Sequence, residues 1–431
     1  MNSYKIVSFL LLISVLLLIS CGEKEPLPPQ VEQKKPVIRM AYSWGHGFKN
    51  TIADYKEDVK DRFILETEES IGLNHKQKIL IDLSSDTLPD VFMFWSYETN
   101  LKYLAENGYL LDIQEYFDAS HTVARDDFYA ESLSATEIQG INYAVPHEVF
   151  FGFMAANKAL FEKYELDIPS SWDEIRDISP VFLENDIIPL YMGSFRGDPG
   201  HLFFSALAYQ DRNGYSDTMA IKDTLNFETP GNIQAAEAII ELIEMGAIPK
   251  NTIYSGSFEQ QVTAYNQRKT ALSFSFNWSL ALFNEDIVDE TIIIPVPRIS
   301  GESRDTAAFT VGGTAQSVCI NKESWDDPEK RATIIEIVDW LLSDKVFITR
   351  MKQSGTIPAK KMELPKMDNP MYDKVFDFVD SVEVLGIHEF YFNSLGSFDV
   401  YKEANDLLWS GVLNRDEFME MVQKGIEQNN E

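Results

Sequence analysis

The stretch GINYAVPHEVFFGFMAAN, residues 140–157, holds two strand patterns with a polar interruption between them. Every second residue from 141 to 145 is apolar, as in a half-buried strand, and FFGFMAAN is the continuous apolar run of a fully buried strand. Pro146 removes a ladder donor at the end of the first pattern, and His147 and Glu148 follow it. We therefore expect two strands, with a group able to carry charge placed between two core segments.

Length and charge restrict the classes of protein to consider. A chain of 431 residues is long enough for two or three domains, and a hydrophobic content of 45% suffices for large cores. The formal net charge of −31 disfavours a nucleic acid partner, because a polyanion requires a basic surface that releases counterions. From residue 37 onward, short apolar runs alternate with segments of helical period, which predicts an α/β fold with largely parallel strands.

Several segments can be predicted as individual elements. The runs expected as strands are VIRMAY (37–42), KILIDL (78–83), VFMFW (91–95), NYAVP (142–146), FFGFMAAN (150–157), TALSFSF (270–276), TIIIPVP (291–297) and AQSVCIN (315–321). Ser171 and Glu174 form a capping box that predicts the start of a helix. Thr229 and Asp327 each precede a proline and are expected to cap further helices.

Residues 1–20 are typical of an export signal, in which Lys5 is followed by the apolar run IVSFLLLISVLLLIS. The ending LISCG, residues 18–22, resembles a bacterial lipobox, in which the signal is cut before Cys21 and that cysteine carries a lipid. A plain signal peptide with an incidental cysteine is the alternative. Residues 21–36 are charged and rich in proline, so we expect a tether between the lipid and the folded part. Cys319 is expected to be a small buried hydrophobe.

Catalytic motifs give no support to an enzyme. The sequence has no Gly-x-Ser-x-Gly elbow, His-Glu-x-x-His motif, Cys-x-x-Cys pair or phosphate-binding loop. The six histidines include no pair at a helical spacing suited to a metal, so we expect neither a metal site nor a cofactor. A glycosidase needs only two carboxylates, and a chain with 68 acidic residues leaves that alternative open.

Tryptophans stand at the ends of several predicted strands. Ser43 and Trp44 follow VIRMAY, Trp95 ends VFMFW, and Asn277 and Trp278 follow TALSFSF. Ligands of open parallel sheets bind beyond the carboxyl ends of the strands. A single tryptophan is more often a packing residue, but tryptophans at equivalent strand ends favour a shared cleft. Indole faces beside carboxylates and amides suit a sugar, because pyranose C–H surfaces are apolar and the hydroxyls need paired donors and acceptors.

Six further segments, in order along the chain, carry a family resemblance. They are PDV (89–91), GINYAVP (140–146), NKALFEKYELDIPSSWDEI (157–175), RKTALSFSFNWS (268–279), VGGTAQSVCINKES (311–324) and VDWLLSDKVFITRMKQSGTIPAKK (338–361). With them the chain resembles the solute-binding proteins of bacterial ABC sugar importers, the group that includes maltose-binding protein. Glu165 stands where that family usually has Gly, Ser171 replaces Thr, and Leu272 with Ser273 replaces Ala-Met. These scaffold positions affect only the choice of subfamily.

The resemblance implies a type II periplasmic-binding-protein fold, with two discontinuous α/β lobes joined by a hinge and a ligand between them. The implied first lobe is residues 37–147 with 308–356, and the second is residues 148–307 with 357–431. The implied ligand-binding residues are Trp44, Trp95, Glu98, Glu148, Tyr191, Ser194, Asn277, Trp278, Gly312, Gly313, Phe398, Asp399 and Lys402. His147 is a further candidate, and the sequence does not decide whether it contacts the ligand.

The resemblance also implies a function. We expect an extracytoplasmic, membrane-anchored lipoprotein that captures a sugar or oligosaccharide by hinge closure and delivers it, as a monomer, to the permease of an ABC importer. One alternative is a receptor of the same fold that feeds a sensor system, and a less favoured one is a lipoprotein glycoside hydrolase. A ligand such as a polyol phosphate is disfavoured by the acidic composition.

Overall fold

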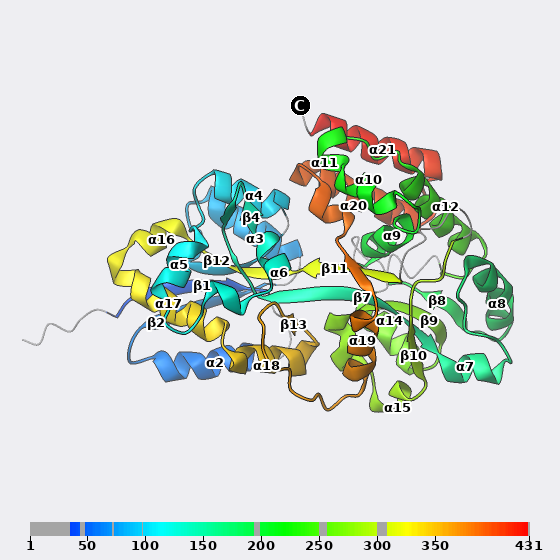
Figure 1. The fold of residues 1–431 in the computed structure, drawn as a ribbon, viewed down its shortest axis with the longest axis horizontal. Coiled ribbons are helices and arrows are strands. Elements are labelled where there is room, and N and C mark those ends of the chain that lie inside the picture. Colours follow the sequence, from blue (N-terminus) through cyan, green and yellow to red (C-terminus); the bar gives the residue numbers. More distant parts are fainter. Residues whose placement is uncertain are drawn as a thin grey trace, which may run out of the picture.

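Two sheets form the centres of two lobes that lie side by side, with helices on both faces of each sheet (Figure 1). The computed structural model describes residues 35–43, 48–70, 73–96, 98–193, 199–249, 257–299 and 308–429. Within these ranges, no helix is both long and apolar enough to cross a membrane. The architecture is a two-lobed α/β fold, as expected.

The first lobe is built on a five-stranded sheet of order β2-β1-β3-β12-β6. Its strands are β1 (Val37–Tyr42), β2 (Ile64–Glu69), β3 (Val91–Trp95), β6 (Val145–Pro146) and β12 (Gln316–Ile320). β1 is parallel to β2 and β3, whereas β12 is antiparallel to β3 and β6. The surrounding elements are α2 (Phe48–Val59), α3 (Leu73–Ser84), α4 (Glu98–Glu106), α5 (Ile113–Ala119), η1 (Arg125–Asp127), α6 (Ala130–Ser134), the pair β4 (Glu137–Ile138) and β5 (Ile141–Asn142), α16 (Lys322–Asp326), α17 (Pro328–Leu341) and α18 (Asp344–Ser354).

The second lobe is built on a sheet of order β14-β11-β7-β9-β8, with β10 and β13 also paired to β7. Its strands are β7 (Glu148–Asn157), β8 (Ile188–Tyr191), β9 (Thr270–Phe276), β10 (Thr291–Ile294), β11 (Phe309–Thr314), β13 (Ile357–Pro358) and β14 (Glu383–Leu385). Its helices are α7 (Lys158–Lys163), α8 (Trp172–Glu184), α9 (Gly200–Ala208), α10 (Gly214–Met219), α11 (Ile221–Thr224), α12 (Pro230–Glu244), α14 (Phe258–Asn266), η2 (Asn277–Leu282), α15 (Glu285–Val288), α19 (Met371–Asp380), η3 (His388–Tyr391), α20 (Leu395–Trp409) and α21 (Arg415–Gln428).

Each lobe has its own hydrophobic cores. Tyr116, Val318 and Ile337 are fully buried in the first lobe. Phe204 and Trp409 are fully buried in the main core of the second lobe, where α9, α20 and neighbouring helices cover the sheet. Each sheet buries apolar faces under helices, and Met351 of α18 also packs with Phe151 and Phe283, so this helix contacts both lobes.

Local sequence signals predicted many of these elements correctly. Ser171 accepts from the Glu174 N–H and Glu174 reaches back, so the predicted capping box starts α8. Thr229 and Asp327 cap α12 and α17 through hydrogen bonds from backbone N–H groups. The strands at 37–42, 91–95 and 270–276 are confirmed.

Two expectations about the strands are wrong. KILIDL belongs to helix α3, in which Ile79 is buried and Ile81 is 60% exposed. A short apolar run does not by itself distinguish a strand from a helix. The second sheet is also not largely parallel, because β9, β10, β11 and β13 all run antiparallel to β7.

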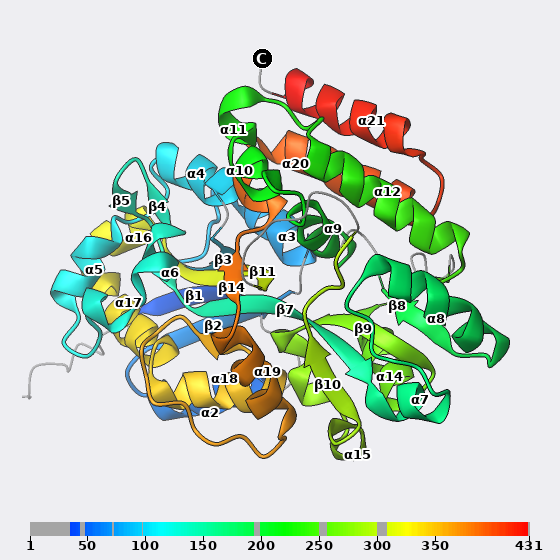
Figure 2. The same ribbon diagram turned by 45° about the vertical axis from the view of Figure 1, so that its right-hand side comes forward.

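The chain passes between the lobes three times: the first two crossings are single residues that lie next to each other, and the third leads from α18 to β13. β6 ends in the first sheet and β7 begins in the second, so only His147 lies between them. On the return path, β11 belongs to the second sheet and β12 to the first, with only Ala315 between them. The His147 N–H donates to Gln316 O at 3.0 Å, and the Ala315 N–H donates to Glu148 O at 2.8 Å. Figure 2 shows β7 running from beside the first sheet into the second.

The position of β11 differs from the implied lobe boundary. Residues 308–314 were expected in the first lobe, but Gly312 and Gly313 pair with Phe151 and Phe150 of β7. The strand therefore continues the second sheet up to the crossing at Ala315.

Candidate functional site

Trp95 ends β3 at one edge of the first sheet, as the strand pattern predicted. Met40 of β1 lies opposite Val91 of β3 in a parallel register, so the carboxyl ends of both strands share this edge. The Trp95 ring is partly buried, and the Lys76 ammonium lies 4.8 Å from its centroid. Trp44 lies outside the described residues. Glu98 begins α4, but its side chain is also outside what the structure describes.

An ion pair joins the two lobes beside Trp95. Lys76 lies on α3, which packs on the first sheet, and its Nζ is 3.1 Å from Oε1 of Glu389 in η3 of the second lobe. We call this contact the interlobe ion pair. Its Lys76 and Glu389 side chains are only 15% and 5% exposed. The pair therefore lies between the lobes and largely out of solvent.

The surroundings of the interlobe ion pair favour its charged form. His201 Nε2 of α9 lies 3.5 Å from Glu389 Oε2. Burial acts to raise the pKa of Glu389, but the Lys76 charge and the interaction with His201 outweigh it and leave this pKa below its ordinary value. The Lys76 ammonium also lies 5.7 Å from the centroid of Phe398, so two aromatic rings flank it. A cation beside aromatic faces is favoured by their quadrupoles.

The predicted residues of α20 stand near this contact but differ in exposure. Phe398 is 2% exposed and lies against His201 and the core, so its ring is mainly a packing group. Asp399 is exposed, and partial loss of solvent raises its pKa against the opposing charges of Lys402 and Lys76. Lys402 Nζ lies 5.5 Å from the Phe398 ring. The start of α20 therefore adds one charge of each sign near the interlobe ion pair.

An aromatic group of the second lobe follows β9, where the sequence predicted Trp278. The Trp278 ring is stacked on Phe276, with centroids 4.4 Å apart and an interplanar angle of 4°. Phe150 lies 5.7 Å from Trp278 and 6.3 Å from Phe390 of η3. Trp278 and Phe390 remain partly exposed. The group presents flat apolar faces held in place by packing.

The Asn277 side chain is engaged by backbone groups of the protein. The Phe151 N–H donates to its Oδ1 at 3.0 Å, and its Nδ2 donates to Val149 O at 3.2 Å and Gly355 O at 3.3 Å. The side chain is 1% exposed. Because backbone groups engage both ends of the amide, Asn277 joins β7 to the end of α18.

The His-Glu pair that interrupts the opening stretch is also directed into the protein. His147 is fully buried, its ring lies 4.7 Å from that of Phe347, and burial lowers its pKa to about 3. Glu148 is 8% exposed and pairs with Arg350 of α18 at 3.3 Å. Burial raises the pKa of Glu148, although Arg350 opposes that change. In this conformation the Glu148 carboxylate binds Arg350 next to the crossing between the lobes. The His147 side chain has no exposed surface that a ligand could contact.

The two glycines of β11 are required by packing within the protein. A Cβ on Gly312 would lie 2.4 Å from Phe150 O. A Cβ on Gly313, whose φ is +151°, would lie 2.6 Å from the Phe390 ring. Only glycine allows the backbone to approach this closely. These positions therefore allow β7 and η3 to pack against β11.

The remaining predicted residues are placed as follows. Tyr191 ends β8 and is partly buried, which raises the pKa of its hydroxyl. Ser194 and Cys21 lie outside the described residues. Within the described ranges, no three His, Cys, Asp or Glu side chains are grouped so as to hold a metal ion.

The sequence did not single out Lys76, Glu389 and His201, which the structure brings together. Lys76 stands just before KILIDL, a run expected to be a strand, and nothing in its neighbours marks a site. Glu389 lies in HEFYF, residues 388–392, a second His-Glu pair followed by aromatic residues. The similarity of this pair to His147 and Glu148 is the feature of the sequence that could have drawn attention to Glu389.

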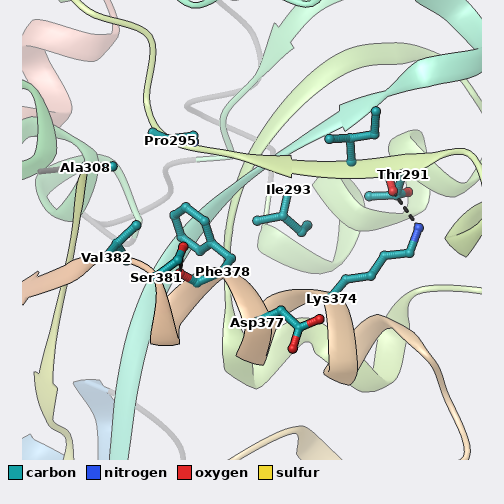
Figure 3. A pocket seen from close by; sticks show the side chains of 10 residues that line it. Thr291, Ile293, Pro295, Ala308, Lys374, Asp377, Phe378, Ser381 and Val382 are labelled. Atoms are coloured by element: carbon teal, nitrogen blue, oxygen red, sulfur yellow. Dashed lines mark hydrogen bonds between the residues drawn. The ribbon is translucent and has the colours of Figure 1, made fainter.

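A separate cavity of about 500 Å³ lies on the second lobe between β10 and α19 (Figure 3). It is lined by Thr291, Ile292, Ile293, Pro295, Ala308, Lys374, Asp377, Phe378, Ser381 and Val382. Lys374 Nζ donates to Val288 O at 2.7 Å and to Thr291 O at 2.8 Å, so backbone carbonyls hold its charge. None of the described residues that the sequence predicted for the ligand is among these lining residues.

Comparison with known proteins identifies the family. Residues 73–346 match the description "Bacterial extracellular solute-binding protein". The chain belongs to this family of solute-binding proteins. A search of curated protein sequences found no match.

Solved structures with the same two-lobed fold share little sequence with this solute-binding protein. A chitin oligosaccharide binding protein has a TM-score of 0.79 at 15% identity, covering 91% of this chain and 99% of its own. A structure from work on xylan utilization by Caldanaerobius polysaccharolyticus has a TM-score of 0.75 at 19% identity, with coverage of 90% and 99%. A sugar transporter of Bacillus licheniformis in complex with stachyose has a TM-score of 0.66 at 18% identity, with coverage of 90% and 98%. At these identities the likeness shows the fold alone.

Proposed function

We propose that this extracellular solute-binding protein captures a carbohydrate between its lobes and releases it chemically unchanged. The observation that carries the proposal is the interlobe ion pair beside Trp95, which joins Lys76 of one lobe to Glu389 of the other. An indole face can pack on a sugar ring while an ammonium and a carboxylate serve its hydroxyls. The carbohydrate-binding proteins that share the fold support this class of ligand.

Hinge closure is the proposed way in which binding produces a change in shape. A ligand drives closure only to the extent that it contacts both lobes in the closed form and one lobe in the open form. We place the lobe boundaries at the crossings His147 and Ala315, so that residues 308–314 move with the second lobe. Together with the segment that leads from α18 to β13, these two single-residue links are the proposed hinge.

Export and delivery complete the proposal. We propose that residues 1–20 are removed, that Cys21 carries the lipid anchor, and that residues 21–36 are the tether. The closed, loaded form would then dock on the permease of an ABC importer. The extracellular family supports a site of action outside the cytoplasmic membrane.

A thermal-shift screen with neutral mono- and oligosaccharides, followed by calorimetry on the best binder, tests the proposed ligand class. A ligand that binds only the folded state raises the melting temperature by mass action. Small-angle scattering should show a smaller radius of gyration in the complex. Absence of binding by every saccharide would refute carbohydrate capture, and cleavage of a bound oligosaccharide would refute release without chemical change.

Trp278→Ala tests whether the exposed stacked ring contacts the ligand. We expect the dissociation constant to rise at least about tenfold, or about 1.4 kcal/mol, because the variant loses a rigid apolar face. Leu282→Ala is the matched control, since Leu282 is 41% exposed and lies in the same element, η2. Equal affinities of the Trp278 and Leu282 variants in calorimetry would remove Trp278 from the site.

A further inference from the structure

The interlobe ion pair holds a cation and an anion together at a site that is largely shielded from solvent. The pair joins Lys76 Nζ and Glu389 Oε1 at 3.1 Å, and both side chains are at most 15% exposed. The rings of Trp95 and Phe398 flank the ammonium at 4.8 and 5.7 Å, and His201 lies 3.5 Å from the carboxylate. Each charge therefore has its main compensation within the protein.

We propose that the interlobe ion pair makes the cleft selective for neutral carbohydrates over uronic acids and amino sugars. This inference rests on the proposed carbohydrate capture. Lys76 has three N–H donors and the Glu389 carboxylate has several acceptor positions, so hydroxyls can bind to both without separating them. A neutral sugar thus adds hydrogen bonds and leaves the charges of the pair compensated.

A charged sugar has to compete with one member of the pair. A uronate carboxylate reaches the ammonium of Lys76 only by displacing Glu389, which then remains buried beside a second negative charge. An amino sugar in turn displaces Lys76 from Glu389. Breaking a buried pair so that one charge loses its partner is strongly unfavourable, because its loss of hydration is no longer compensated.

The described part of α20 adds charges of both signs near the pair. Asp399 and Lys402, both on α20, contribute one negative and one positive group next to the interlobe ion pair. We therefore expect the pairing of Lys76 with Glu389 to determine which ligand charge this contact tolerates.

Calorimetry with trisaccharides of different charge tests the selectivity. The neutral probes are maltotriose, xylotriose and triacetylchitotriose, the anionic probe is trigalacturonic acid, and the cationic probe is the deacetylated chitosan trimer. We expect the best neutral trisaccharide to bind at least about tenfold more tightly than either charged one, which is about 1.4 kcal/mol. A charged trisaccharide that binds as tightly as the best neutral one would overturn the inference while leaving carbohydrate capture intact. No binding by any of the five would refute carbohydrate capture together with the inference.

Two variants assign the selectivity to the pair itself. Glu389→Gln keeps the shape of the side chain and leaves the Lys76 charge without its carboxylate, so the affinity for trigalacturonic acid should improve at least about tenfold relative to the neutral probe. Lys76→Met keeps an apolar stem against Trp95 and leaves the Glu389 carboxylate without its cation. Its affinity for the chitosan trimer should therefore improve relative to the neutral probe. Asp344→Asn, which breaks the Lys360–Asp344 pair of 2.9 Å elsewhere, is the control and should leave both ratios unchanged.

These ratios separate a role in selectivity from a role in stability. A variant that is merely less stable weakens binding of all probes alike, so the ratio of dissociation constants for charged and neutral probes stays constant. Ratios that are the same in wild type, Glu389→Gln and Lys76→Met would show that the interlobe ion pair does not determine selectivity.

Discussion

Replacing Asn277 with alanine removes the side-chain amide that joins β7 to the end of α18. The amide accepts from the Phe151 N–H at 3.0 Å and donates to Val149 O and Gly355 O at 3.2 and 3.3 Å. Each such hydrogen bond contributes about 1 kcal/mol, and a buried group left without a partner costs about 1–3 kcal/mol. Counting the lost bonds and allowing some relaxation, we expect the free energy of unfolding to fall by about 2–4 kcal/mol.

Urea unfolding followed by circular dichroism and tryptophan fluorescence measures this loss. Asn107→Ala is the matched control, because the Asn107 amide donates to Tyr103 O at 2.8 Å on an exposed turn. The control should change the free energy of unfolding by no more than about 0.5 kcal/mol. At a temperature where Asn277→Ala is folded, its affinity for the ligand should stay close to wild type. Unchanged stability combined with lost binding would refute this reasoning and return Asn277 to the ligand site.

Two further predictions concern buried ionisable groups. Arg350→Met should destabilise the protein by about 3–5 kcal/mol at neutral pH, because it leaves the Glu148 carboxylate buried without its partner. Adding Glu148→Gln should recover part of that loss in urea unfolding, and a double variant no more stable than Arg350→Met would contradict this explanation. Burial lowers the pKa of His147 and His388 to about 3, so below about pH 6.5 the unfolded chain binds protons that the folded protein does not. Stability should therefore be fully present above about pH 6.5 and decrease as the pH falls, with a limiting slope of about 1.4 kcal/mol per pH unit for each histidine. His388→Gln should flatten the measured dependence between about pH 6.5 and 5, and an unchanged slope would contradict the assignment to His388.

Local patterns predicted many strands and helices but not which distant side chains meet. The strands that lead to Trp95 and Trp278 were predicted because a strand followed by a tryptophan is visible in consecutive residues. Lys76 and Glu389 could not be found in this way, since their contact joins positions 313 residues apart. KILIDL was assigned to a strand because its apolar residues do not reveal which of them faces a sheet.

Residues 140–157 also show that local sequence does not determine the partners of individual polar side chains. The sequence placed a His-Glu pair between two strands, and the structure has the crossing between the lobes at that place. The neighbouring residues in the sequence did not determine where the His147 and Glu148 side chains point. Glu148 is held by Arg350, 202 residues further on, and His147 lies against Phe347.

The sequence by itself determined the alternation of strands and helices, the helix caps, the break at Pro146 and the aromatic residues at the strand ends. These features depend on residues within a few positions of each other, where propensity and hydrogen bonding are local. Only the tertiary structure decided that Asn277 and Glu148 are bound within the protein and that Lys76 and Glu389 meet between the lobes. Burial and the partner of a charged or amide group depend on which distant segments pack together, and that packing is a property of the folded chain as a whole.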